Sequence, residues 1–206
     1  MKVFSTLVGA ADLAHHLHDA RWRVFDCSFD LVHPHAGELA YREVHIPGAI
    51  YAHLERDLSG PLTGRNGRHP LPDPARFAAR LSEWGVGNDT QVVVYDDAGG
   101  TYAGRMWWML RWLGHDAVAL LDGGINAWEA AGYETSDAET KHPHAVFVPR
   151  LRPEMAVDVR FVESQSARDG VRLLDARNPQ RFRGENETLD PVGGHIPGAV
   201  NRFFKD

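Results

Sequence analysis

The feature that most constrains this chain is a five-residue motif, His-Ile-Pro-Gly-Ala, that occurs twice, at 45–49 and at 195–199. Each copy follows a short apolar run that ends in an aspartate, Asp26 in the first case and Asp175 in the second. The histidine comes 19 residues after Asp26 and 20 residues after Asp175. The repeated unit therefore has a period near 149 residues, far longer than the roughly 20–50 residues of solenoid repeats. The sequence predicts two copies of one domain.

The segments between the two motifs alternate between strand and helix patterns. Short apolar runs, rich in β-branched residues, are typical of buried strands, and they lie at 22–26, 48–52, 91–95 and 117–121. Amphipathic or glycine-terminated stretches are typical of helices, and they lie at 9–20, 74–84, 101–113 and 125–131. Asp73-Pro74 has the form of a helix N-cap followed by proline at the first helical position. This alternation predicts an α/β fold, a parallel sheet with helices on both faces.

The same pattern restarts after an irregular stretch. Residues 136–152 have no clear period and are predicted to be an extended linker between a domain at 1–135 and a second one at 153–206. The second copy has a helix pattern from Asp158 and a strand pattern at 171–175, but no counterpart of the strand at 91–95. It is therefore predicted to be the incomplete beginning of a domain, in a protein of about 280 residues if the first copy is doubled.

Composition excludes several classes of protein. The formal net charge of −6 argues against a nucleic-acid partner, which would need a basic surface. No apolar run approaches the roughly 18 residues of a membrane span, and Ser5, Thr6 and Asp12 break the apolar run that a secretory signal would need. The single cysteine, Cys27, excludes an internal disulfide. A cytoplasmic protein without a membrane partner is the simplest prediction.

Further motifs follow in a fixed order along the chain. They are Tyr41-x-x-x-His45-Ile46-Pro47-Gly48-Ala49, Asp96-Asp97, Arg105-Met106-Trp107-Trp108-Met109, Leu121-Asp122-Gly123-Gly124, Asp175-Ala176-Arg177, Arg181-Phe182-Arg183-Gly184 and Gly194-His195-Ile196-Pro197-Gly198-Ala199-Val200-Asn201. In this order they resemble the tandem rhodanese-domain sulfurtransferases, the thiosulfate and 3-mercaptopyruvate sulfurtransferase family. The resemblance covers essentially the whole chain, and the doubled motif makes it specific. It implies a rhodanese-like fold in both copies.

The resemblance also implies a reaction. A sulfane sulfur passes from a small anionic donor, thiosulfate or 3-mercaptopyruvate, to a thiol or to cyanide, through a persulfide on a cysteine of the second domain. The cysteine starts the loop after a central strand, where backbone N–H groups and the dipole of the next helix favour the thiolate. No cofactor is implied.

The position of that cysteine in the first domain is held by Asp96, directly after the strand at 91–95. A carboxylate cannot accept and release a sulfane sulfur, so the first domain is predicted to be non-catalytic. Cys27 lies at the end of another strand and is predicted to be a small packed residue. The nucleophilic cysteine is expected beyond Asp206, and the 206-residue chain alone is predicted to be inactive.

The resemblance implies that Arg181 binds the sulfur donor. Arginine suits this role because it can bind an oxyanion through two parallel hydrogen bonds. Some mercaptopyruvate-preferring relatives carry a second arginine nine residues further along. That position is Asp190 in this chain, and an acid there would repel a carboxylate donor.

The histidines have a structural interpretation. His45 and His195 are predicted to fix the Ile-Pro-Gly turns by hydrogen bonds, and Asp26 and Asp175 to hold the same turns or nearby backbone N–H groups. The paired histidines elsewhere, at 15–18, 33–35 and 142–144, have spacings that match no closed zinc site, so no metal is predicted. Trp107, Trp108 and Trp112 are predicted to be packing residues of a helix.

Two alternatives remain open. A non-catalytic rhodanese-like binding or regulatory module is possible because the complete first domain lacks the nucleophile. A phosphatase related by fold would need a longer loop between cysteine and arginine, and no residues of this chain support one. The residues after Asp206 discriminate between the enzyme and the module.

Overall fold

The apolar runs of the first part of the chain form a five-stranded parallel sheet in the computed structural model, which describes residues 3–165, 168 and 170–205. The strand order is β1-β5-β4-β2-β3. The strands are β1 (Leu7–Val8), β2 (Trp22–Asp26), β3 (Ile50–Tyr51), β4 (Gln91–Tyr95) and β5 (Val118–Leu121). The central strand β4 is buried along its whole length, which explains why its sequence is apolar on both faces rather than alternating.

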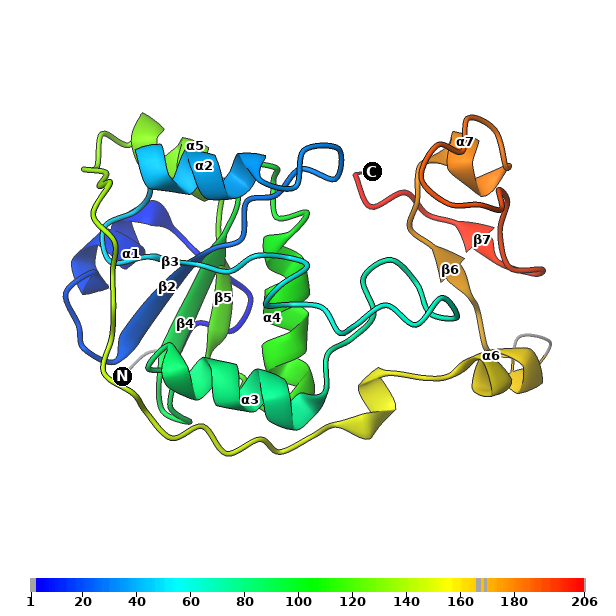
Figure 1. Cartoon of the computed structure of the whole chain (residues 1–206), viewed down its shortest axis with the longest axis horizontal. Helices are drawn as coiled ribbons and strands as arrows, with labels where there is room; N and C mark the ends of the chain where they lie inside the picture. The colour runs from blue at the N-terminus through cyan, green and yellow to red at the C-terminus, as the bar shows by residue number, and fades with distance from the viewer. Residues whose placement is uncertain (1–2, 166–167, 169, 206) are drawn as a thin grey trace. The chain divides into compact units, whose positions relative to one another are not determined.

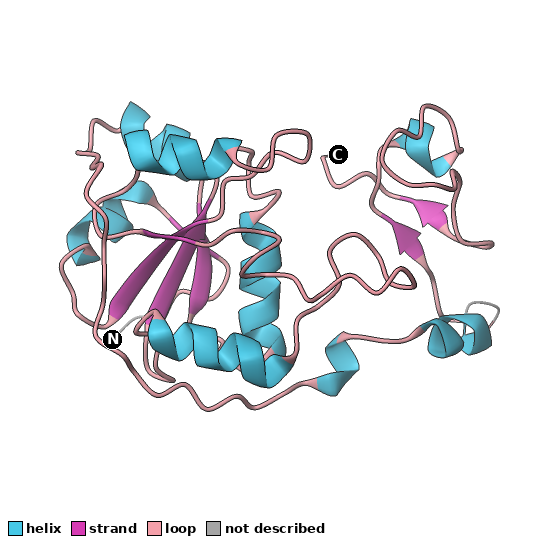
Figure 2. Ribbon diagram, in the orientation of Figure 1, coloured by secondary structure: helices cyan, strands magenta, loops and turns pink. Residues whose placement is uncertain are grey.

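Helices cover both faces of this sheet (Figures 1 and 2). They are α1 (Ala10–His16), α2 (Ala36–Glu43), α3 (Pro74–Glu83), α4 (Ala103–Trp112) and α5 (Gly124–Ala130). On one face, Leu13 of α1, Tyr41 of α2 and Trp128 of α5 belong to one core cluster with side chains of β2, β4 and β5. On the other face α4 packs on β4 and β5, and Trp84, the C-cap residue of α3, lies with its ring centroid 5.2 Å from that of Phe25. The predicted α/β class is confirmed.

Most element boundaries follow from local signals. Asp73 caps α3 as predicted, because its carboxylate accepts a hydrogen bond of 2.9 Å from the Arg76 N–H. The first helix is shorter than the predicted 9–20, since it ends at His16. The reason is a competing turn, in which the Asp19 carboxylate accepts from the Arg21 N–H at 2.9 Å. The two-residue edge strand β1 was not predicted.

The stretch 136–152, predicted to be a linker, packs along the first unit of the structure, Met1–Arg152. It contains no helix or strand, but Ser136 forms an antiparallel bridge with His45. Further along, the Phe147 N–H donates to Ser82 Oγ at 3.1 Å, and Phe147 is buried. Arg152 closes the stretch with two hydrogen bonds to the Asp116 carboxylate, of 2.8 and 2.6 Å. Its irregular sequence therefore forms an ordered segment.

The second unit, Pro153–Asp206, contains a short parallel strand pair like that of β2 with β3. It contains a 3₁₀ turn η1 (Pro153–Met155), the helices α6 (Val159–Gln165) and α7 (Pro179–Phe182), and the strands β6 (Leu174–Asp175) and β7 (Val200–Asn201). Asp175 pairs with Asn201 in parallel, as Asp26 of β2 pairs with Tyr51 of β3. Asp206 lies outside the described residues, and the expected continuation after it stays a prediction. None of the described helices is both long and apolar enough to cross a bilayer.

The ordered stretch 136–152 leads to a testable expectation at Ser82. The buried Ser82 hydroxyl donates to the Ala78 carbonyl and accepts from the Phe147 N–H. Ser82→Ala leaves the Phe147 N–H without its acceptor, which should lower the free energy of unfolding by about 1–2 kcal/mol. Urea denaturation and amide hydrogen exchange at Phe147 measure the effect. The control is Ser164→Ala on an exposed helix position, and equal losses in both variants would contradict the expectation.

Candidate functional site

Both copies of the repeated motif build the same turn. The His45 ring stacks on Tyr41 at a centroid distance of 4.0 Å, and its Nδ1 lies 2.6 Å from the Tyr41 carbonyl oxygen. The His195 ring stacks on Phe182 at 3.7 Å, with Nδ1 2.7 Å from the Phe182 carbonyl oxygen. The glycines of the two motifs have φ values of +79° and +84°, a conformation that favours glycine. The predicted hydrogen bonds of the histidines are present, but they go to a carbonyl outside the turn, so each histidine ties the start of its turn to the helix before it.

The aspartates that end β2 and β6 hold backbone N–H groups, also as predicted. Asp26 Oδ1 accepts from the Ser28 N–H at 2.8 Å, and Asp175 Oδ1 accepts from the Arg177 N–H at 2.9 Å. Their surroundings differ in charge. Burial raises the pKa of Asp26, whereas hydrogen bonds from the Arg177 side chain, one of them 2.6 Å long, lower the pKa of Asp175.

Asp96 lies at the carboxyl end of the central strand, in the loop that leads into α4. The residue is 1% exposed, and its carboxylate accepts four backbone N–H bonds. Oδ1 accepts from Ala98 at 2.9 Å and Gly100 at 2.7 Å, and Oδ2 accepts from Tyr102 at 2.8 Å and Ala103 at 2.9 Å. Converging N–H groups of this kind form an anion-binding concavity. In this loop, which we call the Asp96 loop (residues 96–103), the anion is the chain's own carboxylate.

Glycines make this convergence possible. Gly99 and Gly100 have φ values of +69° and +86°, which turn the loop back toward Asp96. Gly124, at the start of α5, approaches the loop from another strand end. A Cβ on Gly124 would lie 2.1 Å from the Asp96 carbonyl oxygen, so no side chain is tolerated there. Gly124 of the Asp122-Gly123-Gly124 motif therefore allows the start of α5 to pack closely against this loop.

Cys27 is buried at the end of β2, and its N–H donates to the carbonyl of Tyr95, the residue before Asp96. The residue is 1% exposed, and its Sγ lies 3.7 Å from Met106 Sδ. Burial raises the pKa of the Cys27 thiol well above its usual value, so the neutral thiol is the stable form and a nucleophilic thiolate is disfavoured. The predicted packing role of Cys27 is confirmed.

Arg181 lies in α7 and is held by two carboxylates. Its Nε donates to Glu187 Oε2 at 2.9 Å and its Nη2 donates to Asp190 Oδ2 at 2.7 Å. Hydrogen bonding from Arg181 lowers the pKa of Glu187 to about 2. The neighbouring Arg183 instead pairs with Glu185 at the surface, where both side chains are more than half exposed. The structure thus places Arg181 beside Asp190, as the sequence suggested, and adds Glu187.

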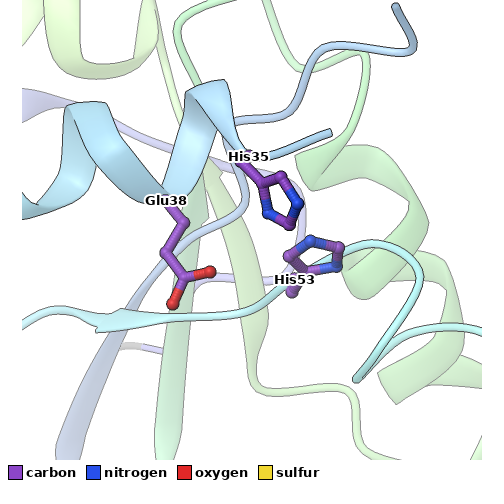
Figure 3. A group of neighbouring side chains, drawn as sticks. All are labelled: His35, Glu38 and His53. Atoms are coloured by element: carbon purple, nitrogen blue, oxygen red, sulfur yellow. The ribbon is translucent and has the colours of Figure 1, made fainter. Parts of the chain in front are cut away.

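One group of possible metal ligands lies on α2 and the loop after β3. Atoms of His35, Glu38 and His53 lie within 4.8 Å of one another (Figure 3). His53 Nδ1, however, accepts from the N–H groups of Glu55 and Arg56 at 3.1 and 3.2 Å. This fixes the proton on Nε2, whereas a metal-binding histidine needs that nitrogen unprotonated and donates from the other. The group is therefore poorly suited to a metal.

The tryptophans of α4 are packing residues. Trp108 and Trp112 stack with ring centroids 6.0 Å apart, and the Trp107 indole N–H donates to the Ser5 carbonyl at 3.0 Å, which ties α4 to the segment before β1. Their predicted packing role is confirmed.

Comparison with known proteins gives a consistent result. Residues 9–131 match the family model described as a rhodanese-like domain. The chain is 48% identical over 202 residues to a probable 3-mercaptopyruvate sulfurtransferase of Pseudomonas aeruginosa, and 39% identical over 185 residues to the putative thiosulfate sulfurtransferase SseB of Mycobacterium tuberculosis. The crystal structure of SseA from Escherichia coli, a 3-mercaptopyruvate sulfotransferase, superposes with a TM-score of 0.82 at 33% identity.

The relatives are longer than this chain. The matched region spans 97% of the chain and 71% of the Pseudomonas protein, and 89% of the chain and 62% of the Mycobacterium protein. The superposition covers 96% of the chain and 74% of the crystallised protein.

The roles of two residues of the site were missed by sequence reasoning. Gly124 belongs to one of the motifs quoted above, but the close approach that requires a glycine there depends on a loop 28 residues earlier. Glu187 belongs to an acidic stretch with no periodicity, and its spacing of six residues from Arg181 is not a helical pairing. Its position carried no local signal.

The Asp96 loop gives a second expectation. Asp96→Ala removes the acceptor of four N–H groups, so the free energy of unfolding should fall by at least about 3 kcal/mol. Asp96→Asn should lose about half as much, because its oxygen can still accept two of these bonds while its amide cannot accept the others. Asp97→Ala, at the exposed neighbour, should change stability by less than about 0.5 kcal/mol. A small loss in Asp96→Ala, measured by urea denaturation, would contradict this account of the loop.

Proposed function

Because the chain belongs to the rhodanese-like domain family, we propose that the complete protein is a sulfurtransferase. It would move a sulfane sulfur from a small anionic donor, thiosulfate or 3-mercaptopyruvate, to a thiol or to cyanide. Both donor classes appear in the names of its relatives. We further propose that residues 1–135 and 153–206 belong to two copies of one rhodanese-like domain, joined by 136–152, and that the protein acts in the cytoplasm.

The Asp96 loop is the observation that carries the proposal. The loop follows the central strand, its N–H groups converge on a single anionic group, and α4 begins at its end. The same arrangement around a cysteine would stabilise a thiolate and a persulfide. With a carboxylate in that place the first unit has the scaffold without the nucleophile. We therefore place the reactive cysteine on the corresponding loop of the second domain, beyond Asp206.

The donor site is proposed at Arg181. The residue follows the carboxyl end of β6 by six positions, and loops at the carboxyl ends of parallel strands are where α/β sheets bind ligands. Its guanidinium can bind a sulfonate or carboxylate group through charge-assisted hydrogen bonds. Asp190, 2.7 Å from Arg181, adds a negative charge to the site that would repel an anionic donor such as 3-mercaptopyruvate or thiosulfate.

A second candidate function is supported by the same loop. The complete first unit lacks a nucleophile, since Asp96 fills the loop and Cys27 is buried. A protein with no cysteine in the corresponding loop of its second domain would be a non-catalytic binding or regulatory module.

The proposal gives an expectation for the chain itself. The 206-residue chain should show no thiosulfate:cyanide sulfurtransferase activity, because Asp96 cannot carry sulfur and Cys27 is a buried thiol of raised pKa. Thiocyanate production is the readout, with buffer as the baseline. Turnover well above that baseline that persists in Cys27→Ser would refute the assignment of the nucleophile.

In the complete protein, Arg181→Ala should raise the KM for the donor about tenfold or more, because a charge-assisted contact contributes roughly 1.5–3 kcal/mol. Arg181→Lys should recover part of the loss, since lysine keeps the charge but lacks the planar fork. The matched control is Arg183→Ala, whose partner Glu185 is exposed. Steady-state kinetics separate the cases, and a wild-type KM in Arg181→Ala together with a raised KM in Arg183→Ala would place the site elsewhere.

A further inference from the structure

One edge of the Arg181 guanidinium that could bind an oxyanion already forms hydrogen bonds within the protein. Nε and Nη2 lie along one edge of the group, and this edge forms two parallel hydrogen bonds in bidentate recognition. Here Nε is bound to Glu187 and Nη2 to Asp190, at 2.9 and 2.7 Å. A donor that binds this edge of Arg181 must therefore displace or share one of these carboxylates.

Glu187 is held independently of Arg181. Its Oε1 accepts from the N–H groups of Leu189 and Asp190 at 2.9 and 3.0 Å, and its side chain is only 6% exposed. Arg177 Nη1 lies 3.9 Å from its other oxygen. The position of this carboxylate therefore does not depend on Arg181 alone.

The surface pair next to it provides a contrast. Glu185 bonds to Arg183 through both of its oxygens, at 3.0 and 2.8 Å, with both side chains more than half exposed. Exposed pairs of this kind contribute little and re-form easily. Glu187 is different because the backbone positions it and most of its surface is covered.

We propose that Glu187 is a positioning residue of the donor site, an internal anion that occupies the Arg181 fork and competes with the donor for it. This inference rests on the proposed function for the role of Arg181. Its consequence is weak donor binding, and removal of the Glu187 charge should increase the affinity of Arg181 for oxyanions. A purely structural role would have the opposite result, since loss of the pair would disorder the loop.

The test is oxyanion binding to the 206-residue chain, with inorganic sulfate and thiosulfate as probes at constant ionic strength. Glu187→Gln is the informative variant, because its amide oxygen can still accept from Leu189 and Asp190 while its NH₂ group cannot accept from Arg181. We expect sulfate and thiosulfate to bind Glu187→Gln at least about tenfold more tightly than the wild type, the lower end of the range for one charge-assisted contact. Calorimetry gives the affinities, and the Arg181 Nε–H NMR signal reports the site.

Two control variants test whether a gain in oxyanion affinity is specific to Glu187 and depends on Arg181. Glu185→Gln should bind within about twofold of the wild type, and the double variant Arg181→Ala/Glu187→Gln should lose the gain. An affinity in Glu187→Gln that equals or falls below the wild-type value overturns the proposal, as does a gain that survives the loss of Arg181. If Glu187→Gln fails to fold, Glu187→Asp takes its place, because its shorter side chain draws the carboxylate back from Arg181 Nε, and the absence of an Arg181-dependent gain there overturns the proposal as well.

Failure of this inference is distinguishable from failure of the proposed function. If Glu187→Gln gains affinity through Arg181 but Arg181→Ala leaves the donor KM of the complete protein unchanged, Glu187 still controls the fork and the donor site lies elsewhere. If Arg181→Ala raises the KM but Glu187→Gln gains nothing, the donor site stands and the competition by Glu187 is refuted.

Discussion

The carboxyl end of β4 is the point on which the rest of the first unit depends. The Tyr95 carbonyl accepts from the Cys27 N–H at 2.8 Å, which continues the pairing of β2 with β4, and the Tyr95 hydroxyl accepts from the Ile46 N–H of the first repeated motif at 3.2 Å. Asp96 follows and gathers the loop that starts α4. A strand covered on both faces cannot shift without exposing apolar side chains. The buried strand β4 therefore holds the first repeated motif (residues 45–49) and the Asp96 loop in fixed positions relative to each other.

Local signals in the sequence were sufficient for most elements but not for the contacts between them. The N-cap at Asp73 and the continuous apolar run of β4 depend on a few adjacent residues, and both were predicted correctly. The hydrogen bond between Ser82 and Phe147 joins residues 65 positions apart, and no sequence periodicity indicates it. The stretch 136–152 was for that reason interpreted as a linker, and the edge strand β1 was missed because two residues carry no pattern.

The candidate site shows the same division. The position of Asp96 after a strand and the position of Arg181 before a repeated motif could be read from the residues. The four N–H groups that bond to the Asp96 carboxylate could not be predicted from the sequence, and neither could the two carboxylates that bond to the Arg181 guanidinium. Both sets of contacts depend on the three-dimensional path of a loop. The two aspartates before the motifs illustrate the limit, since identical placement in sequence gives Asp26 a buried site and Asp175 an arginine partner.

The packing of residues 136–152 has a practical consequence for anyone who wishes to isolate the first unit. The match to the rhodanese-like domain model ends at residue 131, yet the His45 ring reaches the Ala138 carbonyl and the buried Phe147 ring packs beside His115. A gene fragment cut where the similarity stops would leave the repeated turn without its cover and an apolar surface open to water. Tolerance to truncation follows the burial of the removed backbone, so the natural place for such a cut is after Arg152, where the ordered polypeptide of the unit ends.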